Sequence, residues 1–264
     1  MQMKHKILIS ILFLLVILEA CTKDDITNRN SGNNNNSINI IANKQATGSS
    51  SNDLLSDATF KSMVIEVVYV EGFEPTTVAI NNFKSFLEAR TYKPNGITVE
   101  KRAIPSLGKA IYSIEDISAI EDANRTKYNT DTQIAVWAFF ANGKSDKDNG
   151  NSMVLGTAYR NTSFVVFEET IKNSSNSPFE PNRTLLETTV INHEFGHILG
   201  LTNLGTPLQS EHEDAEHPKH CNAESCLMYW AAESSAGIAN MVNMSSAPPL
   251  DAQCLADLQA NGGK

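Results

Sequence analysis

Short apolar runs rich in β-branched and aromatic residues alternate with segments of helical spacing between residues 60 and 200. Apolar runs of about four to eight residues are typical of strands, and apolar residues three or four positions apart are typical of helices. The pattern predicts strands at 63–70, 97–101, 133–140, 153–159 and 163–167. It predicts helices at 76–90 and 114–123, one that begins with a capping box at Thr184 and Glu187, and a last one at 250–258.

The order of these elements predicts an α/β (α+β) fold with a twisted mixed sheet of about five strands. The helix at 76–90 would back this sheet, and the helix that begins at residue 184 would pack beside it. We expect the strand at 133–140 in the centre and the strand at 153–159 at an edge. A free edge strand can hold an extended peptide by strand addition.

The first 20 residues have the composition of an export signal. Lys4 and Lys6 precede an apolar run, residues 7–18, that is too short to span a membrane comfortably. The tetrapeptide that ends at Cys21 resembles the lipobox of bacterial lipoproteins, in which the signal is cut before a cysteine that receives lipid. The resemblance implies an exported protein, anchored through Cys21 to the outer membrane or cell surface. An uncleaved anchor helix is the alternative.

Residues 21–58 are rich in Asn and Ser and poor in apolar side chains, which predicts a flexible tether. Its start, Lys23-Asp24-Asp25, resembles the surface-export signal of Bacteroidetes-type lipoproteins, although a solvated charge run has the same composition. Residues 59–264 would then form one folded catalytic domain, which we expect to be a monomer.

The charge of the chain restricts its partners. It carries 21 Lys and Arg against 30 Asp and Glu, a net charge of −9. Removal of residues 1–20 would leave 19 basic and 29 acidic residues, a net charge of −10. Nucleic acid is excluded because no Lys/Arg cluster offers the footprint that phosphates require. Membrane contact is expected through the lipid anchor only.

The helix that begins at residue 184 carries His193-Glu194-Phe195-Gly196-His197. Residues four positions apart lie on one face of an α-helix, so both imidazoles can point at one metal ion with Glu194 beside them. Five of the six histidines of the chain fall between His193 and His220. The pattern predicts a hydrolytic zinc site with His193 and His197 as ligands and Glu194 as general base.

A catalytic zinc ion takes three protein ligands and keeps a fourth position for water, so a third ligand is required. The motif and the following Gly200 resemble the metzincin clan, whose third histidine comes three residues after that glycine. Asn203 stands there instead. The spacing His220-Cys221, four residues, Cys226-Leu227-Met228 is similar to that of the archaemetzincins, and the interval from His220 to Met228 is also similar to that of the matrixins.

This resemblance implies that His220 is the third ligand, that Met228 forms the Met-turn, and that residues 203–219 are an insertion. His217 is the main rival of His220, with His212 behind it. The resemblance also implies a small C-terminal subdomain that contains the Met-turn and the terminal helix. The acidic insertion reads as a solvated loop or, alternatively, as a place for a second ion.

Three cysteines remain once Cys21 is lipidated. An exported protein favours disulfides, and we expect one between Cys221 and Cys226. The archaemetzincins instead hold a second, structural zinc ion, which a Cys-x-x-Cys pair completes. This chain has Asp251 and Cys254 at those positions, so a second zinc site on Cys221, Cys226, Asp251 and Cys254 is the alternative.

The resemblance implies a zinc-dependent endopeptidase with one catalytic Zn²⁺ and a protein or peptide substrate. The metal would bring the pKa of a bound water to about 7, and Glu194 would take its proton. The alternative is a zinc-containing surface lipoprotein for binding or adhesion, with reduced catalytic activity. The presence of Glu194 favours the enzyme, because metal binding alone does not require it.

Overall fold

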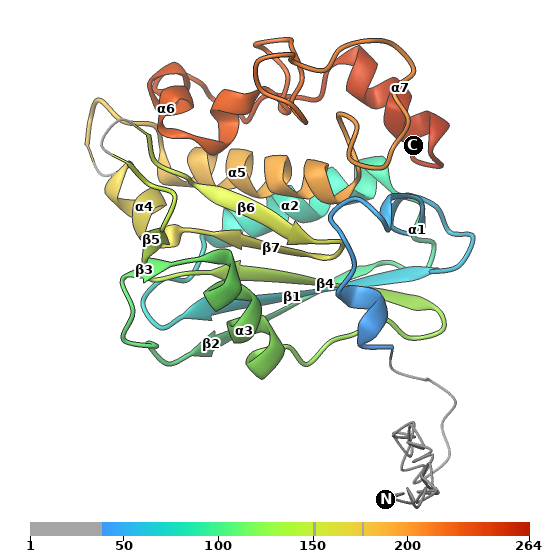
Figure 1. Ribbon diagram of the computed structural model, residues 1–264, viewed down its shortest axis with the longest axis horizontal. Helices are drawn as coiled ribbons and strands as arrows, with labels where there is room; N and C mark the ends of the chain where they lie inside the picture. The colour runs from blue at the N-terminus through green and yellow to red at the C-terminus, as the bar shows by residue number, and fades with distance from the viewer. Residues whose placement is uncertain (1–38, 150–151, 176) are drawn as a thin grey trace, which may run out of the picture. The chain divides into compact units, whose positions relative to one another are not determined.

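The computed structural model describes residues 39–149, 152–175 and 177–264 (Figure 1). The expected export signal, the lipobox and Cys21 lie outside these ranges. No helix in the described ranges combines the length and the apolar content that crossing a bilayer requires.

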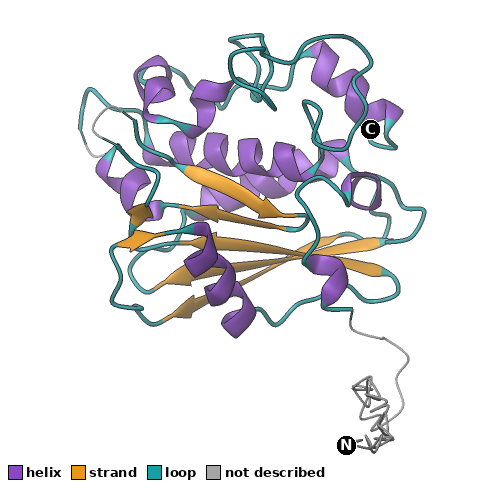
Figure 2. Cartoon of the chain, in the orientation of Figure 1, coloured by secondary structure: helices purple, strands orange, loops and turns teal. Residues whose placement is uncertain are grey.

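The predicted elements are present in the predicted order, with bounds that differ by three residues at most, and further short helices and strands lie between them (Figure 2). The strands are β1 (Ser62–Val70), β2 (Ile97–Ile104), β3 (Ile111–Tyr112), β4 (Gln133–Phe140), β5 (Lys144–Ser145), β6 (Gly156–Arg160) and β7 (Ser163–Val166). The α-helices are α1 (Ser51–Leu55), α2 (Thr77–Arg90), α3 (Ile114–Asn124), α4 (Glu168–Asn173), α5 (Arg183–Ile198), α6 (Ser235–Met241) and α7 (Ala252–Ala260). Two 3₁₀ helices are η1 (Ile41–Asn43) and η2 (Trp230–Glu233).

The main sheet has five strands in the order β2-β1-β4-β7-β6. β1 pairs in parallel with β2 and β4, β4 pairs in parallel with β7, and β6 runs antiparallel to β7. The predicted mixed sheet, with its central strand at 133–140 and its edge strand after residue 153, is therefore confirmed. A second, two-stranded sheet joins β3 to β5.

Both faces of the main sheet are covered. In Figure 1, α3 lies on one face, α2 and α5 lie on the other, and the chain after residue 200 covers α5 from beyond. Alternate residues of β1 serve the two faces, since Ile65 and Val67 join the core under α2 and α5, while Val68 and Val70 join the core on the α3 side. Side chains alternate along a strand, so an almost wholly apolar strand indicates burial on both faces.

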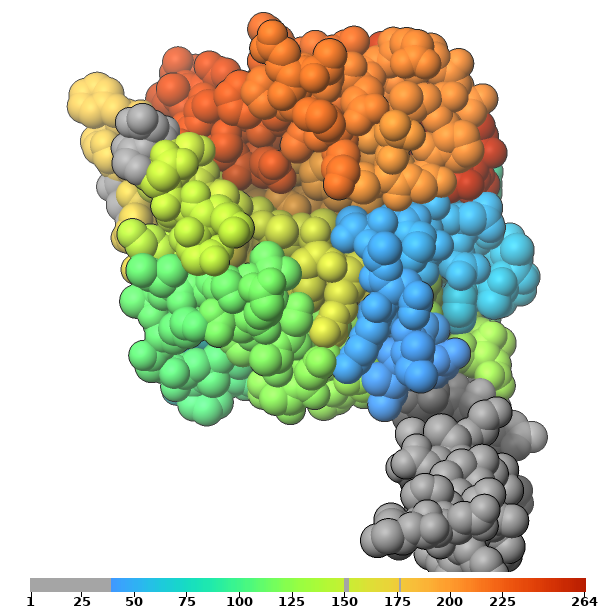
Figure 3. Space-filling model, in the orientation of Figure 1, coloured from blue at the N-terminus to red at the C-terminus, as the bar shows by residue number. Residues whose placement is uncertain are grey.

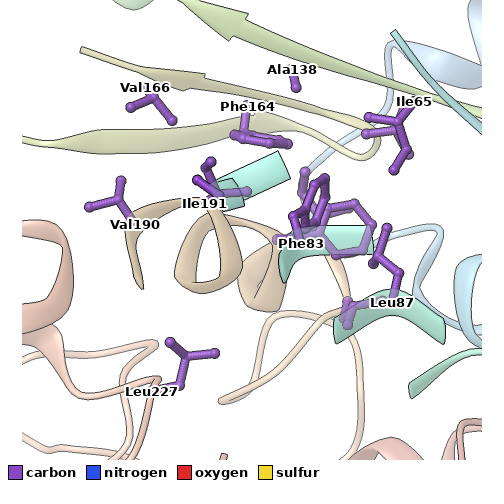
Figure 4. Packing of buried hydrophobic residues seen from close by; sticks show 14 of the residues in the cluster. Ile65, Phe83, Leu87, Ala138, Phe164, Val166, Val190, Ile191 and Leu227 are labelled. Atoms are coloured by element: carbon purple, nitrogen blue, oxygen red, sulfur yellow. The ribbon is translucent and has the colours of Figure 1, made fainter. Parts of the chain in front are cut away.

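An aromatic cluster fixes α5 against the sheet. Phe83 of α2 packs edge-on to Phe164 of β7 and to Phe195 of α5, with ring centroids 5.9 Å and 5.1 Å away. Figure 4 shows Phe83 and Phe164 in the layer between the sheet and the helices. Because Phe195 lies inside the H-E-x-x-H motif, this cluster also sets the position of the two motif histidines.

The start of α5 differs from the prediction. The side chain of Asn182, not that of Thr184, caps the helix and accepts a hydrogen bond from the Thr184 amide at 2.9 Å. Glu187 does not bind the backbone at the start of its helix, because its Oε2 accepts hydrogen bonds from the amide and hydroxyl of Thr76 and its Oε1 lies 2.9 Å from Nε of Arg183. Thr76 caps α2, so Glu187 ties the two helices together.

Residues 39–58 belong to the folded domain, so the expectation of a flexible tether over 21–58 is wrong for this part. Leu54 and Leu55 of α1 are fully buried. Asn43 is buried as well, and its amide group donates to Asn129 Oδ1, to the carbonyl oxygen of Ala135 and to Thr162 Oγ1. The polar composition of this segment suggested that it is exposed to solvent. The amide group of Asn43 instead forms hydrogen bonds with buried polar groups of the domain.

We predict that Phe83→Ala lowers the free energy of unfolding by about 3–5 kcal/mol, because it removes a fully buried ring from the cluster under α5. Chemical denaturation followed by circular dichroism measures this change. Phe179→Ala is the matched control, since the side chain of Phe179 is 87% exposed and its loss should change stability by less than about 0.5 kcal/mol. Equal effects of the two substitutions would contradict the packing described.

Candidate metal centre

The two motif histidines lie one turn apart on α5 and face the same point. Their ring centroids are 4.8 Å apart and their Nε2 atoms 3.1 Å apart. Nδ1 of His193 lies 2.7 Å from the carbonyl oxygen of Leu227, which can only accept, so Nδ1 carries the proton and donates it. The lone pair of His193 Nε2 is then available to a metal ion.

Gly200 turns the chain away from the end of α5. Its φ of +78° is in the left-handed region, which favours glycine. A Cβ at this position would lie 2.7 Å from the amide nitrogen of Thr206 and 2.9 Å from Cβ of Ser51, so there is no room for a side chain. The turn ends the helix in the way that a C-terminal glycine commonly does.

The chain then makes the loop of residues 203–219 and returns to the site at His220. Asn203, at the position of the clan's third histidine, donates from Nδ2 to Glu213 Oε2 at 3.1 Å and lies within the loop. The ring centroid of His220 lies 5.3 Å from that of His193 and 5.0 Å from that of His197. Three imidazoles thus converge from two distant parts of the chain.

The two rival histidines lie elsewhere. His217 stacks on Trp230 with ring centroids 4.2 Å apart, and its Nδ1 is 2.9 Å from Asp214 Oδ2. His212 is buried in a separate cluster with cysteines. Of the three candidates, the structure brings only His220 to the motif histidines.

Met228 packs directly beneath α5. It is fully buried, and a Cβ at Gly196 would overlap its sulfur and lie 3.1 Å from its Cε. The backbone of the same turn is tied to the third histidine, since the amide of Cys221 donates to the carbonyl of Met228 at 2.8 Å. The position expected for the Met-turn is therefore occupied, and Gly196 is the reason that the turn can come so close.

Glu194 is buried and held by the edge strand. Its Oε2 accepts a hydrogen bond from the backbone amide of Ala158 in β6 at 2.7 Å, and its Oε1 has no hydrogen-bond partner. Gly156 of the same strand leaves room for the carboxylate, because a Cβ there would lie 2.7 Å from Oε1. Burial and the nearby carboxylate of Glu233 raise the pKa of Glu194 well above its usual value.

Glu233, at the end of η2, joins the three histidines, which the sequence analysis did not foresee. Its Oε1 lies 3.2 Å from Nε2 of His220, and its Oε2 lies 3.5 Å and 3.8 Å from Nε2 of His193 and His197. Burial would raise the pKa of this carboxyl, but the three histidines hold it well below its usual range. No spacing in the sequence marks it, because pairing with residues 153–155 brings it to the histidines.

The residues fit a zinc ion. Nε2 of all three histidines lies within 3.8 Å of the Glu233 carboxylate, and, among the residues that the structure describes, Oε1 of Glu194 beside them is buried without a hydrogen-bond partner. Burial lowers the pKa of His197 to about 4, so its imidazole is neutral at pH 7, as a metal ligand must be. Three imidazoles with a carboxylate form one of the donor sets that zinc prefers.

A second group of donors lies behind the loop. Cys221 Sγ is 3.5 Å from His212 Nδ1 and 3.2 Å from Asp251 Oδ2, and Cys254 Sγ is 4.0 Å from the same His212 nitrogen. Cys226 Sγ lies 3.6 Å from Cys254 Sγ. All three cysteines are free thiols, so the expected disulfide between Cys221 and Cys226 does not form. We expected that disulfide because exported proteins favour disulfides. The fold instead places the sulfurs of Cys221 and Cys254 beside His212.

A cavity of about 200 Å³ lies beside the histidines, lined by parts of α5, β6, η2 and the returning loop. Thr47 also lines it and donates to the carbonyl oxygen of Ala158 at 3.5 Å. In Figure 3 the segment that contains Thr47 (blue) lies against β6 (yellow) and the loop after α5 (orange). The N-terminal segment therefore forms one wall of the cavity.

No protein-family model matches this chain, and no curated protein matches it. The chain is similar in structure to archaemetzincin from Methanopyrus kandleri, with a TM-score of 0.50 and 16% sequence identity over 76% of this chain and 96% of that one. At this identity the likeness shows the fold. The metzincin-like fold expected from the H-E-x-x-H region is thereby confirmed.

We predict that His220→Ala lowers the zinc content of the purified protein far more than His217→Ala does. The first substitution removes one of the three converging imidazoles, whereas the second removes a ring that stacks on Trp230. Metal analysis by mass spectrometry after dialysis against a weak chelator measures the zinc content. The reverse ranking would show that the loop presents a different histidine to the metal.

Proposed function

We propose that this protein is a zinc-dependent endopeptidase in which His193, His197 and His220 hold the metal and Glu194 is the general base. The observation that carries the proposal is the arrangement of four groups beside one cavity, which His197, His220 and Glu194 line. Three imidazoles converge there, and a buried carboxylate beside them keeps one oxygen without a partner. A histidine cluster for metal storage or for structure alone has no use for that carboxylate.

When bound, zinc would polarise the substrate carbonyl and lower the pKa of a water molecule. The residues of the chain supply the remaining functions. Oε2 of Glu194 is fixed by the amide of Ala158, so Oε1 is the atom that accepts the proton of the attacking water. The same atom can then return the proton to the leaving amine. The raised pKa of Glu194 suits a group that both takes and gives a proton.

The substrate of this proposal is an extended polypeptide. Thr157 and Ala158 line the cavity and belong to β6, the edge strand of the main sheet. An edge strand can pair with an extended peptide through backbone hydrogen bonds, and these need no particular side chain. The amide of Ala158 is engaged by Glu194 and its carbonyl by Thr47, so such pairing would use the other backbone groups of this edge. A peptide paired there would pass Glu194 and the histidines, which favours cleavage within a chain.

The proposal also includes the subcellular localisation of the protein. The apolar run of residues 7–18 and the tetrapeptide that ends at Cys21 support a lipid-anchored enzyme on the outer membrane or cell surface. Membrane contact would then come from the lipid anchor, and the net charge of the chain is consistent with a body that stays off anionic lipid.

We predict that Glu194→Gln lowers the rate of casein cleavage at least 100-fold and leaves the zinc content equal to that of the wild type. The amide is similar in size but cannot accept the proton of the water. Zinc analysis and a cleavage assay on the same preparation test both parts. If the wild type binds zinc and cleaves no better than Glu194→Gln, the alternative of a zinc-containing binding or adhesion protein is correct.

We also propose that His212, Cys221, Asp251 and Cys254 hold a second, structural zinc ion. Their donor atoms lie within 4.8 Å of one another. His212 Nε2 lies 2.7 Å from the buried Asp257 Oδ2, a partner that would orient the ring for binding through Nδ1. Such an ion would hold Cys221, and hence the adjacent His220, in place.

We expect two zinc ions per wild-type chain and one per chain of His212→Ala, which should retain the ion at His193 and His197. Asn203→Ala is the control within the same loop and should leave two. Metal analysis combined with thiol titration before and after chelation measures the outcome, because bound thiolates react slowly. One zinc ion per wild-type chain, together with a disulfide between Cys226 and Cys254, would contradict the second site.

A further inference from the structure

The carboxylate of Glu233 lies where a fourth metal ligand would be. In a tetrahedral zinc site with bonds of about 2.0–2.1 Å, neighbouring donor atoms are roughly 3.3 Å apart. Nε2 of His193 and His197 are 3.1 Å apart, and oxygens of Glu233 lie 3.2 Å, 3.5 Å and 3.8 Å from the three Nε2 atoms. Oε1 of Glu233 faces His220 and Oε2 faces the two motif histidines, and the donor atoms of all four residues lie within 4.8 Å of one another. The carboxylate is therefore placed at the three imidazoles as a fourth donor would be.

The backbone around Glu233 is fixed by residues 153–155, the segment that leads into β6. The amide of Leu155 donates to the carbonyl of Glu233 at 2.9 Å. The next residues are paired too, since Val154 forms a bridge with Ser234 and the amide of Ser235 donates to the carbonyl of Met153 at 3.1 Å. The fold thus places this carboxylate at the histidines by hydrogen bonds.

The two carboxylates of the site are held by one stretch of chain. Leu155 binds the backbone of Glu233, and Ala158, three residues later, binds the side chain of Glu194. Their freedom differs, however. Glu194 is fixed at its own carboxylate, whereas Glu233 is fixed at its backbone and its side chain is 29% exposed. The Glu233 side chain can therefore turn away without loss of these backbone bonds.

We propose that Glu233 is a fourth protein ligand of the metal in the resting protein and occupies the position that the hydrolytic water requires. Structural zinc sites have four protein ligands, and catalytic sites keep one position open. The resting site would be closed, and hydrolysis would begin only when the Glu233 side chain has left the metal. This inference rests on the proposed zinc site and adds a built-in form of latency to it.

Cobalt(II) reports this coordination without any need for turnover. We would load the full-length wild type, Glu233→Gln, Glu233→Asp and the control Glu224→Gln with Co²⁺ and record visible spectra while titrating azide. Glu224 is exposed and lies outside the histidine cluster. We expect both Glu233 variants to change the spectrum and to bind azide at least tenfold more tightly than the wild type and the control. Their affinity for Zn²⁺ should fall at least tenfold, and their casein cleavage should rise.

The outcomes separate the two proposals. If the wild type binds Co²⁺ and its spectrum, its azide affinity and its Zn²⁺ affinity match those of both Glu233 variants, Glu233 is not a ligand, and the zinc peptidase proposal is unaffected. If the wild type binds no Co²⁺ or Zn²⁺ at the histidines, both proposals fail. Glu233→Asp guards against misfolding, because it keeps the charge and shortens the side chain by one methylene group.

Discussion

The site depends on the close contact between α5 and the chain that returns as the Met-turn. Two features make that contact. Nδ1 of His193 donates to the carbonyl of Leu227, and the sulfur of Met228 fills the space that a side chain at residue 196 would occupy. The first feature sets the tautomer of a histidine, and the second requires glycine inside the motif. Both link a helix built on the sheet to a turn about 30 residues further along the chain.

The remainder of the domain holds these two parts in register. The cluster of Phe83, Phe164 and Phe195 fixes α5 on the sheet, and the amide of Cys221 ties His220 to the carbonyl of Met228. A long loop can therefore separate the second histidine from the third without loss of the site. Its closure entropy grows only slowly with length, and the hydrogen bonds at its end determine where His220 arrives.

Local patterns allowed much of this structure to be predicted. The order of helices and strands along the chain followed from short β-branched apolar runs and from helical spacing, and two histidines four residues apart on a helix must share a face. The choice of His220 needed the resemblance to a known family. The interval from His220 to Met228 can be read in the sequence, but the path of the loop before His220 cannot. Where a position depends on contacts between distant segments, the sequence was less informative.

Three differences illustrate that limit. In the sequence, Asn43 belongs to a polar segment typical of a tether. In the structure, its side-chain amide donates hydrogen bonds to Asn129 and Thr162, which are far away along the chain. We expected a disulfide between Cys221 and Cys226. In the structure, Cys221 lies with His212 and Cys254, and Cys226 lies beside Cys254. Glu233 has no spacing that marks it, because its place is set by pairing with residues 153–155, about 80 positions earlier.

The convergence of three imidazoles on one ion is the central claim, and anomalous diffraction tests it most directly. Crystals of the zinc-loaded protein would be measured above and below the zinc absorption edge. We predict an anomalous peak about 2.0–2.1 Å from Nε2 of each of His193, His197 and His220. A fully loaded crystal with no peak at these three nitrogens, or with His220 turned away from the ion, would contradict the account.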